Sequence, residues 1–413
     1  MIISGPGGSV LSPLQTPLML ASVAGWVAYV AVRSFAGASD SQRRGPRETM
    51  VAEGPAEELV QKATAISISQ QVDHEPGGTA ERLFEEAEAH YTAYQYPAAA
   101  VKFGASVEAR RSLPAYLSWG AALINSSDFS QAEEILSIGL QMASRLKRED
   151  FRAACMANLA DVQNRLGRID AAEKTCTEAL DLFRMGGDSH GQADVTLTLG
   201  SVYSHRGEYD RARGAYDAAL KRFQAVDNDV GKANALGNMG NLSMHQEQPE
   251  EALSQHRAAL RLHEKVGNPL GRANALANIG NVHFRMRRPK EARQSYDAAL
   301  EIYRKIEVPL GEASVLVNLG NVLFRSGEHD EALQTYEMTL EIHRRIGNIL
   351  GQANTLTNTG SLLARMERRD EALAAVHAAR RLFEKVGART RGAEAAAALI
   401  QRLESKPATD ADG

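Results

Sequence analysis

The sequence has only two cysteines among its 413 residues, Cys155 and Cys176. They are twenty-one residues apart, form no CxxC pair, and have no second pair of cysteines with which to complete a metal site. A disulfide framework and a cysteine-bound metal are therefore excluded. We expect both side chains to be small core residues of a protein kept in a reducing compartment.

The sequence also lacks the short motifs that position catalytic groups. It contains no GxxxxGK[ST], no GxGxxG after a strand, no HExxH and no GxSxG, and the HEKVG segment at 263–267 has no second histidine. The eleven histidines are scattered along the chain. We therefore expect that the protein is not an enzyme and uses neither a cofactor nor a metal.

Positive charge is not in excess. Lysine and arginine total 47 against 51 aspartates and glutamates, the formal net charge is -4, and the chain has no long basic block. Nothing in this balance indicates a nucleic-acid partner. With 44% hydrophobic and 24% charged residues, the chain is long enough for two or three ordinary domains or for one extended array.

The N-terminal segment lacks charge of either sign. Residues 1–32 contain no charged side chain, and residues 18–32 read LMLASVAGWVAYVAV. Extending this run through Arg33 to Ala36 gives a helix of nineteen residues, about 28 Å long and close to the roughly 30 Å hydrocarbon core of a bilayer. One interpretation of residues 1–38 is therefore a hydrophobic helix that anchors the chain in a membrane.

Two other interpretations of the same segment stay open. It could be a removed targeting segment, with Ala36-Gly37-Ala38 as a small-residue cleavage site, although no Lys or Arg precedes the apolar run as a signal peptide requires. It could also be neither. If it is an anchor, the arginines that follow it keep the rest of the chain on the cytoplasmic side. Residues 39–78 are expected to be a mostly disordered linker with at most one short helix at 55–72.

The main signal is a repeat of forty residues. GQADVTLTLGSVY begins at residue 191, and similar segments begin at 231, 271, 311 and 351 without an insertion. A second pattern follows in each unit, as in YDRARGAYDAAL, and its first alanine also recurs at forty-residue steps except for a first step of thirty-three. The series comprises Ala99, Ala132, Ala172, Ala212, Ala252, Ala292, Ala332 and Ala372. The chain therefore contains eight units, followed by TRGAEAAAALIQRLE.

Each unit is predicted to be a pair of antiparallel helices. In the unit that contains ANALANIGNVHFR, Asn268 is a favourable N-cap, Pro269 suits the first helical position, and Gly267 can take the left-handed conformation that ends the preceding helix. The first helix should run from about 269 to 286, and Pro289 should open the second.

Small residues are expected where the two helices of a unit approach closely. We expect Gly280 to face Ala292 and Ala299, with Tyr296 filling the space around them. After the eighth unit, the segment 390–404 is predicted to be a capping helix. Its contacts with the last unit are expected to be Ala393, Ala397, Leu399 and Ile400.

These patterns resemble the tetratricopeptide repeat (TPR) family. The resemblance rests on Leu/Ile-Gly pairs such as Ile279-Gly280, on the alanine series, and on Tyr216, Tyr296 and Tyr336. It covers residues 79–404 and implies an all-α fold, an α-solenoid of about eight helix-turn-helix repeats with a C-terminal capping helix. The N-terminal hydrophobic helix would precede it, and residues 405–413 would form a disordered tail.

The forty-residue spacing and the NxGN segment are most similar to the long-repeat branch of the Pins/LGN polarity adaptors. Those adaptors also carry C-terminal GoLoco motifs that engage G-protein alpha subunits. This sequence ends in SKPATDADG without such a motif, so the G-protein part of their function is not expected here.

Asparagine, a mediocre helix former, recurs inside the first helix of the units. Asn274, Asn278, Asn281 and Arg285 follow the spacing i, i+4, i+7 and i+11, which places them in a stripe about 60° wide, facing away from the core. The same stripe recurs along the concave wall of a solenoid. The candidate peptide-binding residues are Asn158, Asn234, Asn238, Asn241, Asn274, Asn278, Asn281, Asn318, Asn321, Asn354 and Asn358, with Arg165, His205, His245, Arg285, Arg325 and Arg365 at the end of the stripe.

An asparagine amide can both donate to and accept from a peptide backbone, and arginine pairs with carboxylates. TPR grooves of the LGN type hold peptides through such residues, so the resemblance agrees. Alternatively, the stripe is a solvated face, or its amides bridge neighbouring repeats. We expect a non-catalytic adaptor whose concave groove binds an extended, acidic segment of a partner protein. The alternative is a regulatory receptor whose superhelix changes pitch on binding. The partner and the oligomeric state stay open.

Overall fold

The computed structural model describes residues 78–387 and 390–405, and these residues form seventeen helices and no strand. The first eight are α3 (Thr79–Thr92), α4 (Tyr96–Ala109), α5 (Leu113–Asn125), α6 (Phe129–Arg145), α7 (Glu149–Arg165), α8 (Ile169–Met185), α9 (Ser189–Arg206) and α10 (Tyr209–Ala225). They are followed by α11 (Asp229–His245), α12 (Pro249–Lys265), α13 (Pro269–Arg285), α14 (Pro289–Lys305), α15 (Pro309–Ser326), α16 (His329–Arg345), α17 (Ile349–Arg365), α18 (Arg369–Lys385) and α19 (Arg391–Ser405).

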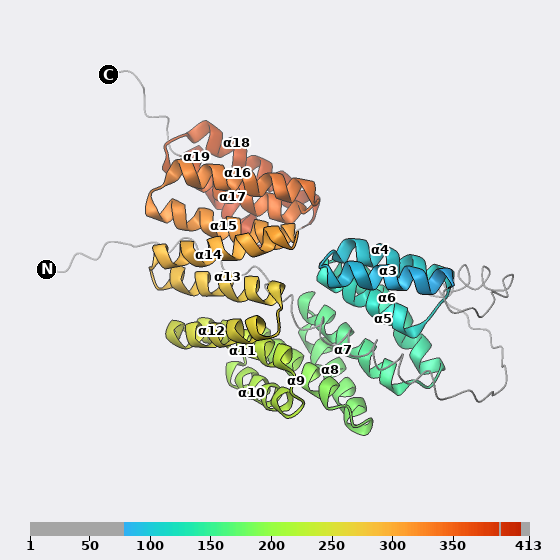
Figure 1. Cartoon of the computed structure of the whole chain (residues 1–413). Coiled ribbons are helices and arrows are strands. Elements are labelled where there is room, and N and C mark those ends of the chain that lie inside the picture. The colour runs from blue at the N-terminus through green and yellow to red at the C-terminus, as the bar shows by residue number, and fades with distance from the viewer. Residues whose placement is uncertain (1–77, 388–389, 406–413) are drawn as a thin grey trace, which may run out of the picture.

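The helices pack as eight antiparallel pairs that stack into a superhelix, with α19 on the last pair (Figure 1). Each odd-numbered helix contacts the next odd-numbered helix from α5 onward, as well as its neighbours in sequence. The odd-numbered helices therefore lie close together along the inner wall, while the even-numbered helices lie outside. The predicted α-solenoid of helix pairs is confirmed.

The helix junctions repeat every twenty residues, half of the sequence repeat. From Ser127 to Gly387, one residue at each junction has a positive φ, and half of these fourteen positions hold glycine. At each junction from α5 to α18, the next residue donates its N–H to the carbonyl five residues before it, as Asn268 does to His263 at 2.9 Å. This is the Schellman arrangement. The same residue also begins the following helix, so one tight turn both ends and starts a helix.

The predicted boundaries of the best-defined unit are confirmed. Gly267 has a φ of 65°, and the Asn268 side chain accepts a hydrogen bond of 2.8 Å from the N–H of Gly271. Pro269 opens α13 and Pro289 opens α14. Local chain chemistry therefore determines where these helices start and stop.

Rings lie flat against glycines at two levels of the stack. Within pairs, a Cβ added to Gly280 would lie 2.5 Å from the Tyr296 ring, and Gly200 and Gly320 meet tyrosines in the same way. Between pairs, a Cβ added to Gly311 would lie 2.3 Å from the Tyr303 ring. The nearest neighbour of Gly280 is the ring of Tyr296, which was expected to fill the space around the close approach. Close packing here depends on a ring against bare backbone.

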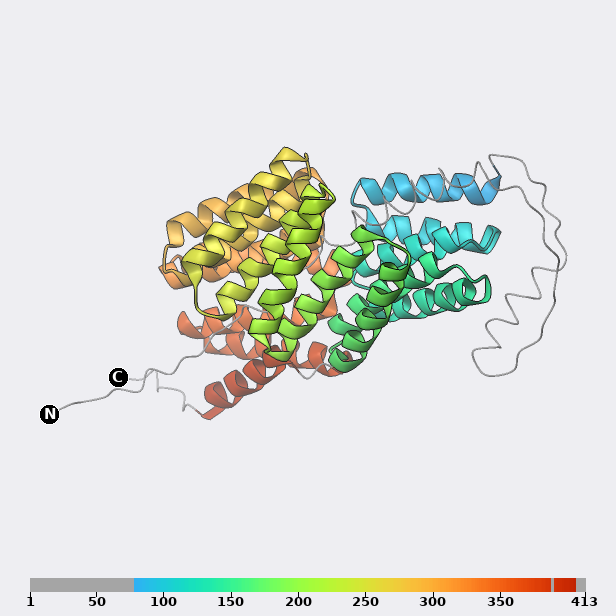
Figure 2. The same cartoon turned by 90° about the horizontal axis from the view of Figure 1, so that it is seen from below.

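One turn of the superhelix brings the first pair back to the start of α13. Figures 1 and 2 both show the junction end of α3 and α4 beside the end of α13. Tyr94, at that junction, packs against the same hydrophobic cluster as Leu270, the second residue of α13, and its hydroxyl reaches the Leu270 backbone. The two ends of this turn are therefore joined by a direct contact.

The last helix covers the end of the stack. Leu399, Ile400 and Leu403 of α19 are buried against a cluster that includes Leu363 and Val376. Among the alanines, Ala396 is fully buried and Ala397 is exposed, so the expected contact at Ala397 was wrong by one residue. A run of four alanines gives no periodic signal from which to set the phase of the buried face.

The two cysteines are core residues, as expected. Cys155 and Cys176 are both free and completely buried. Burial raises the pKa of the Cys155 thiol to about 12, so neither acts as an accessible thiolate near neutral pH.

The hydrophobic segment 1–38, most of the linker 39–78 and the tail 406–413 lie outside the described residues. Within 78–387 and 390–405, no helix combines the length and apolar character needed to cross a membrane.

Candidate functional site

The candidate asparagines all lie on inner-wall helices, as the repeat predicts. α7, α9, α11, α13, α15 and α17 carry the stripe at equivalent positions, forty residues apart. The stripe is not a fully solvated face. Asn158, Asn274, Asn278 and Asn318 are each less than a tenth exposed, so the expectation that these side chains point away from the core was wrong. The reason is that α13, for example, contacts α11, α12, α14 and α15, which leaves only a narrow open strip.

Several of the asparagines hold the stack together. The Tyr296 hydroxyl donates to Asn281 Oδ1 at 2.7 Å, and Asn318 Nδ2 donates to the same oxygen at 3.0 Å, which joins α13, α14 and α15. The Tyr336 hydroxyl donates to Asn321 Oδ1 at 2.6 Å. The Tyr303 hydroxyl donates to Asn274 Oδ1 at 2.5 Å. These amides fulfil the bridging role that the sequence left open.

Other asparagines have side-chain polar atoms that form no hydrogen bond within the described chain. Asn238, Asn241, Asn278, Asn354 and Asn358 make no hydrogen bond through their side chains to another residue in the described part of the chain. Asn158 is 5% exposed, and its Nδ2 likewise has no partner there. Asn234 does have an interaction partner. The structure therefore divides the predicted row into amides used for packing and amides left available.

The basic residues at the end of the stripe also fall into two groups, and the first group has internal partners. Arg165 pairs with Asp161 (Nε to Oδ2, 2.8 Å), with both side chains less than a tenth exposed. His205 shares a hydrogen bond of 2.8 Å with Asn164, and His245 stacks on Tyr209 with ring centroids 6.2 Å apart.

The three arginines further along the stripe have no carboxylate partner. The guanidinium of Arg325 lies 4.7 Å from the ring centroid of Phe284. Within residues 78–387 and 390–405, Arg285, Arg325 and Arg365 have no carboxylate within 4 Å. All three are exposed. The basic character of the stripe is therefore available at its C-terminal end.

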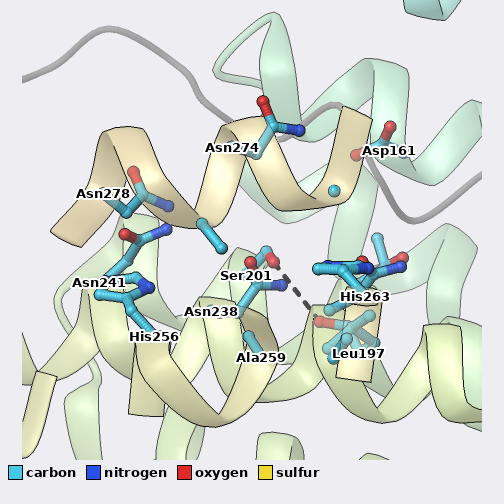
Figure 3. Close-up of a pocket in the computed structure, with 16 residues that line it drawn as sticks. Asp161, Leu197, Ser201, Asn238, Asn241, His256, Ala259, His263, Asn274 and Asn278 are labelled. Carbon is cyan, nitrogen blue, oxygen red and sulfur yellow. Dashed lines mark hydrogen bonds between the residues drawn. The ribbon is translucent and has the colours of Figure 1, made fainter. Parts of the chain in front are cut away.

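Five of the predicted asparagines meet around one pocket of the inner wall (Figure 3). The pocket has a volume of about 50 Å³ and lies between α9, α11 and α13, with α12 behind it. Figure 3 shows Asn241 directly beside His256 at one end, and His263 at the other. The polar lining residues are Asp161, Thr198, Ser201, Asn234, Asn238, Asn241, His256, His263, Asn274 and Asn278.

The pocket exists because α12 carries histidines where neighbouring helices carry larger rings. His256 lies on Gly240 as Tyr296 lies on Gly280, and His263 lies on Gly271 as Tyr303 lies on Gly311. Tyr296 and Tyr303 extend a hydroxyl to an inner-wall asparagine, whereas imidazole is shorter and has none. The space beside Asn241 that a hydroxyl would fill is left open.

Both histidines are neutral in this position. His256 is 1% exposed and His263 4%, and burial lowers the pKa of each from 6.5 to about 4. A neutral imidazole has one donor and one acceptor nitrogen. In each ring, Nδ1 lacks a hydrogen-bond partner within the described residues. The only charged lining residue, Asp161, is paired with Arg165.

A second, smaller hollow lies further along the wall. Asn321, Arg325 and Asn358 meet there with Phe284 and Phe324. Its volume is about 20 Å³, less than half that of the main pocket. It continues the line of polar groups along the wall.

Sequence reasoning missed the two histidines that make the main pocket. The forty-residue alignment places His256 between Tyr216 and Tyr296, and His263 between Phe223 and Tyr303. That substitution within a conserved spacing was the available signal. Within the described ranges, no three His, Cys, Asp or Glu side chains gather in a way that could hold a metal ion.

The sequence matches the tetratricopeptide repeat family model over residues 152–225, 231–305 and 311–387, which together span α7 to α18. The chain belongs to the tetratricopeptide repeat family. No curated protein matches its sequence.

Two solved structures share the fold of this TPR chain. The apo form of the quorum sensor NprR from B. thuringiensis is 15% identical, with a TM-score of 0.54 over 79% of this chain and 93% of its own. A Rap protein complexed with competence and sporulation factor is 14% identical, with a TM-score of 0.51 over 80% of this chain and 97% of its own. At these identities the likeness shows the fold alone.

Proposed function

We propose that the protein is a non-catalytic adaptor whose concave groove holds an extended, acidic segment of a partner protein. The observation that carries the proposal is that Asn238, Asn241 and Asn278 line an open pocket on the inner wall with no internal hydrogen bond. Amides in this state can bond a peptide backbone whatever its side chains are. The exposed Arg285, Arg325 and Arg365 would attract carboxylates along the same strip. We place the chain in the long-repeat branch similar to Pins/LGN because of its forty-residue spacing.

The test selects twelve-residue peptides from a random displayed library on the full-length protein and measures the affinity of the selected peptides. The variant Asn238→Ala/Asn241→Ala/Asn278→Ala should weaken binding by at least about tenfold, because three neutral hydrogen bonds contribute about 0.5 to 1.5 kcal/mol each. Arg285→Ala with Arg325→Ala should weaken binding more at low salt than at high salt. Lys174→Ala on the outer helix α8, with a side chain 81% exposed, is the control. Unchanged affinity in the asparagine variant would refute the groove.

A second candidate is a regulatory receptor in which binding changes the pitch of the superhelix. The contact between Tyr94 and Leu270 favours it, because it spans one superhelical turn and would break if the pitch increased. The likeness in fold to a protein described as a quorum sensor also supports it. Small-angle scattering with and without a saturating selected peptide separates the two candidates. A receptor changes its profile, and an adaptor does not.

We also propose that residues 18–36 tether the repeats to a membrane on its cytoplasmic side, on the strength of the uncharged N-terminal sequence. The full chain should stay with membranes after carbonate washing, and a chain that begins at Ser39 should be released. Recovery of a natural chain that begins near Ser39 would instead show removal of a targeting segment.

A further inference from the structure

We infer that the pocket made by His256 and His263 accepts one uncharged carboxamide side chain, that of an asparagine or glutamine in the bound segment. This inference rests on the proposed function and deepens it, because it assigns one subsite of the groove and its specificity. The two histidines, the asparagines around them and the size of the pocket carry the argument.

The pocket offers no free charge to an occupant. Apart from Asp161, which is paired with Arg165, every residue that lines the pocket is uncharged. The rings of His256 and His263 are neutral near pH 7 because their burial disfavours the charged form. A carboxylate or ammonium group desolvated in this pocket would find no counter-charge, and that arrangement is costly. The occupant is therefore uncharged.

The lining offers hydrogen-bonding groups that nothing in the described chain satisfies, because the amides of Asn238, Asn241 and Asn278 make no internal bonds. An apolar occupant would leave these groups unsatisfied and desolvated. A carboxamide offers one acceptor and two donors, which matches a lining that contains both kinds of group.

The pocket has room for a small polar group. Its volume of about 50 Å³ is several times the roughly 10 to 15 Å³ that one water requires on the same measure. A group of a few non-hydrogen atoms at the end of a flexible stem fits this space. The pocket lies on the inner wall beside Asn238 and Asn278, so a side chain from a segment lying in the groove can reach it (Figure 3).

The test replaces both histidines by tyrosine, the residue that α14 holds at the two equivalent positions. His256→Tyr and His263→Tyr place a tyrosine on Gly240 and Gly271, as Tyr296 and Tyr303 lie on Gly280 and Gly311. We expect the variants to fold and their hydroxyls to fill the pocket. The matched control is His343→Tyr, because His343 lies on Gly351 in the same way and does not line the pocket.

Displayed peptides are selected on the full-length protein as above, and their sequences and affinities are compared. The selected peptides should share an asparagine or glutamine at one position, and its replacement by glutamate or methionine should weaken binding at least about tenfold. His256→Tyr and His263→Tyr should weaken the same peptides similarly, while His343→Tyr should not.

The possible outcomes test the carboxamide subsite and the proposed peptide-binding groove separately. Peptides that bind without a shared carboxamide, or that bind both tyrosine variants unchanged, would overturn the inference and leave the groove in place. Failure to select any peptide would count against the proposed function itself. If a tyrosine variant does not fold, the glutamate and methionine peptides still decide the question on the unmodified protein.

Discussion

The pair α11 and α12 differs from the pair α13 and α14 at the two ring positions that face the inner wall. In the second pair, the hydroxyl of Tyr296 fixes Asn281, and Asn318 of the next pair joins the same oxygen. In the first pair, His256 occupies the position of Tyr296, and Asn241 has no internal bond. One sequence row of asparagines therefore serves two purposes, and the ring behind each asparagine decides which.

The two pairs should differ most in how much stability they lose as the pH falls. The pKa of His256 and His263 is about 4 in the folded protein against 6.5 when unfolded, so the unfolded state takes up protons first as the pH falls. The stability contributed by the neutral rings is complete above about pH 6.5 and is lost between pH 6.5 and 4. By pH 5 the loss is on the order of 2 kcal/mol for each histidine.

Urea unfolding of the wild type and of His256→Tyr/His263→Tyr at pH 7.5 and 5 measures this effect. The double variant should lose less stability between the two pH values, although His343, whose pKa is also lowered to about 4, still contributes in both proteins. Equal losses in the two proteins would show that the histidines do not drive the pH response.

The packing that both pairs share should be the next most sensitive feature. Gly280→Val places a branched side chain where even a Cβ would lie 2.5 Å from the Tyr296 ring, and overpacking of this kind costs about 1 to 3 kcal/mol. Gly214→Ala in α10 is the control. Nothing lies within 4 Å of its added Cβ, so better helix propensity should stabilise the protein by about 0.5 to 1 kcal/mol. Thermal denaturation distinguishes the two, and equal shifts would contradict the ring-on-glycine account.

The two classes of asparagine should differ by a smaller amount. Asn281→Ala leaves the buried hydroxyl of Tyr296 and the amide of Asn318 without a shared acceptor, which should cost about 1 to 2 kcal/mol. Asn241→Ala at the equivalent position of α11 breaks no internal bond and should be close to neutral. Denaturant unfolding of the two variants side by side tests this, and a larger loss for Asn241→Ala would reverse the assignment.

The smallest effect is expected at the junctions. Glu247 closes α11 with a φ of 59°, whereas Gly267 closes α12 with a φ of 65°. Glu247→Gly should therefore stabilise the protein by up to about 1 kcal/mol, and Gly267→Ala should destabilise it by a similar amount. Melting temperatures that move in the same direction for both changes would contradict this.

Helix boundaries could be predicted from the sequence because they depend on local chemistry. Asn268 caps α13, and Pro269 begins it, through contacts within a few residues. The eight pairs followed from the spacing of the alanines, all of which are completely buried.

The roles of individual asparagines could not be predicted in the same way. A helical wheel places Asn278 and Asn281 on one stripe, yet the amide of Asn281 is fixed by a ring from α14 and by Asn318 of α15. Twelve of the seventeen residues of α13 are buried, so most of its circumference is covered by neighbours that the wheel does not contain. The pocket exists because histidine, which has no hydroxyl, replaces tyrosine in α12. That replacement becomes apparent only when the repeats are aligned with one another.

The most direct test of the central claim measures melting temperature and peptide affinity on the same two variants. Asn238→Ala/Asn241→Ala/Asn278→Ala should keep the parent melting temperature, or raise it through better helix propensity, and lose most of its affinity for selected peptides. Asn281→Ala/Asn318→Ala should melt earlier. A first variant that is destabilised and binds as well as the parent would mean that these asparagines hold the array together and that the binding site lies elsewhere.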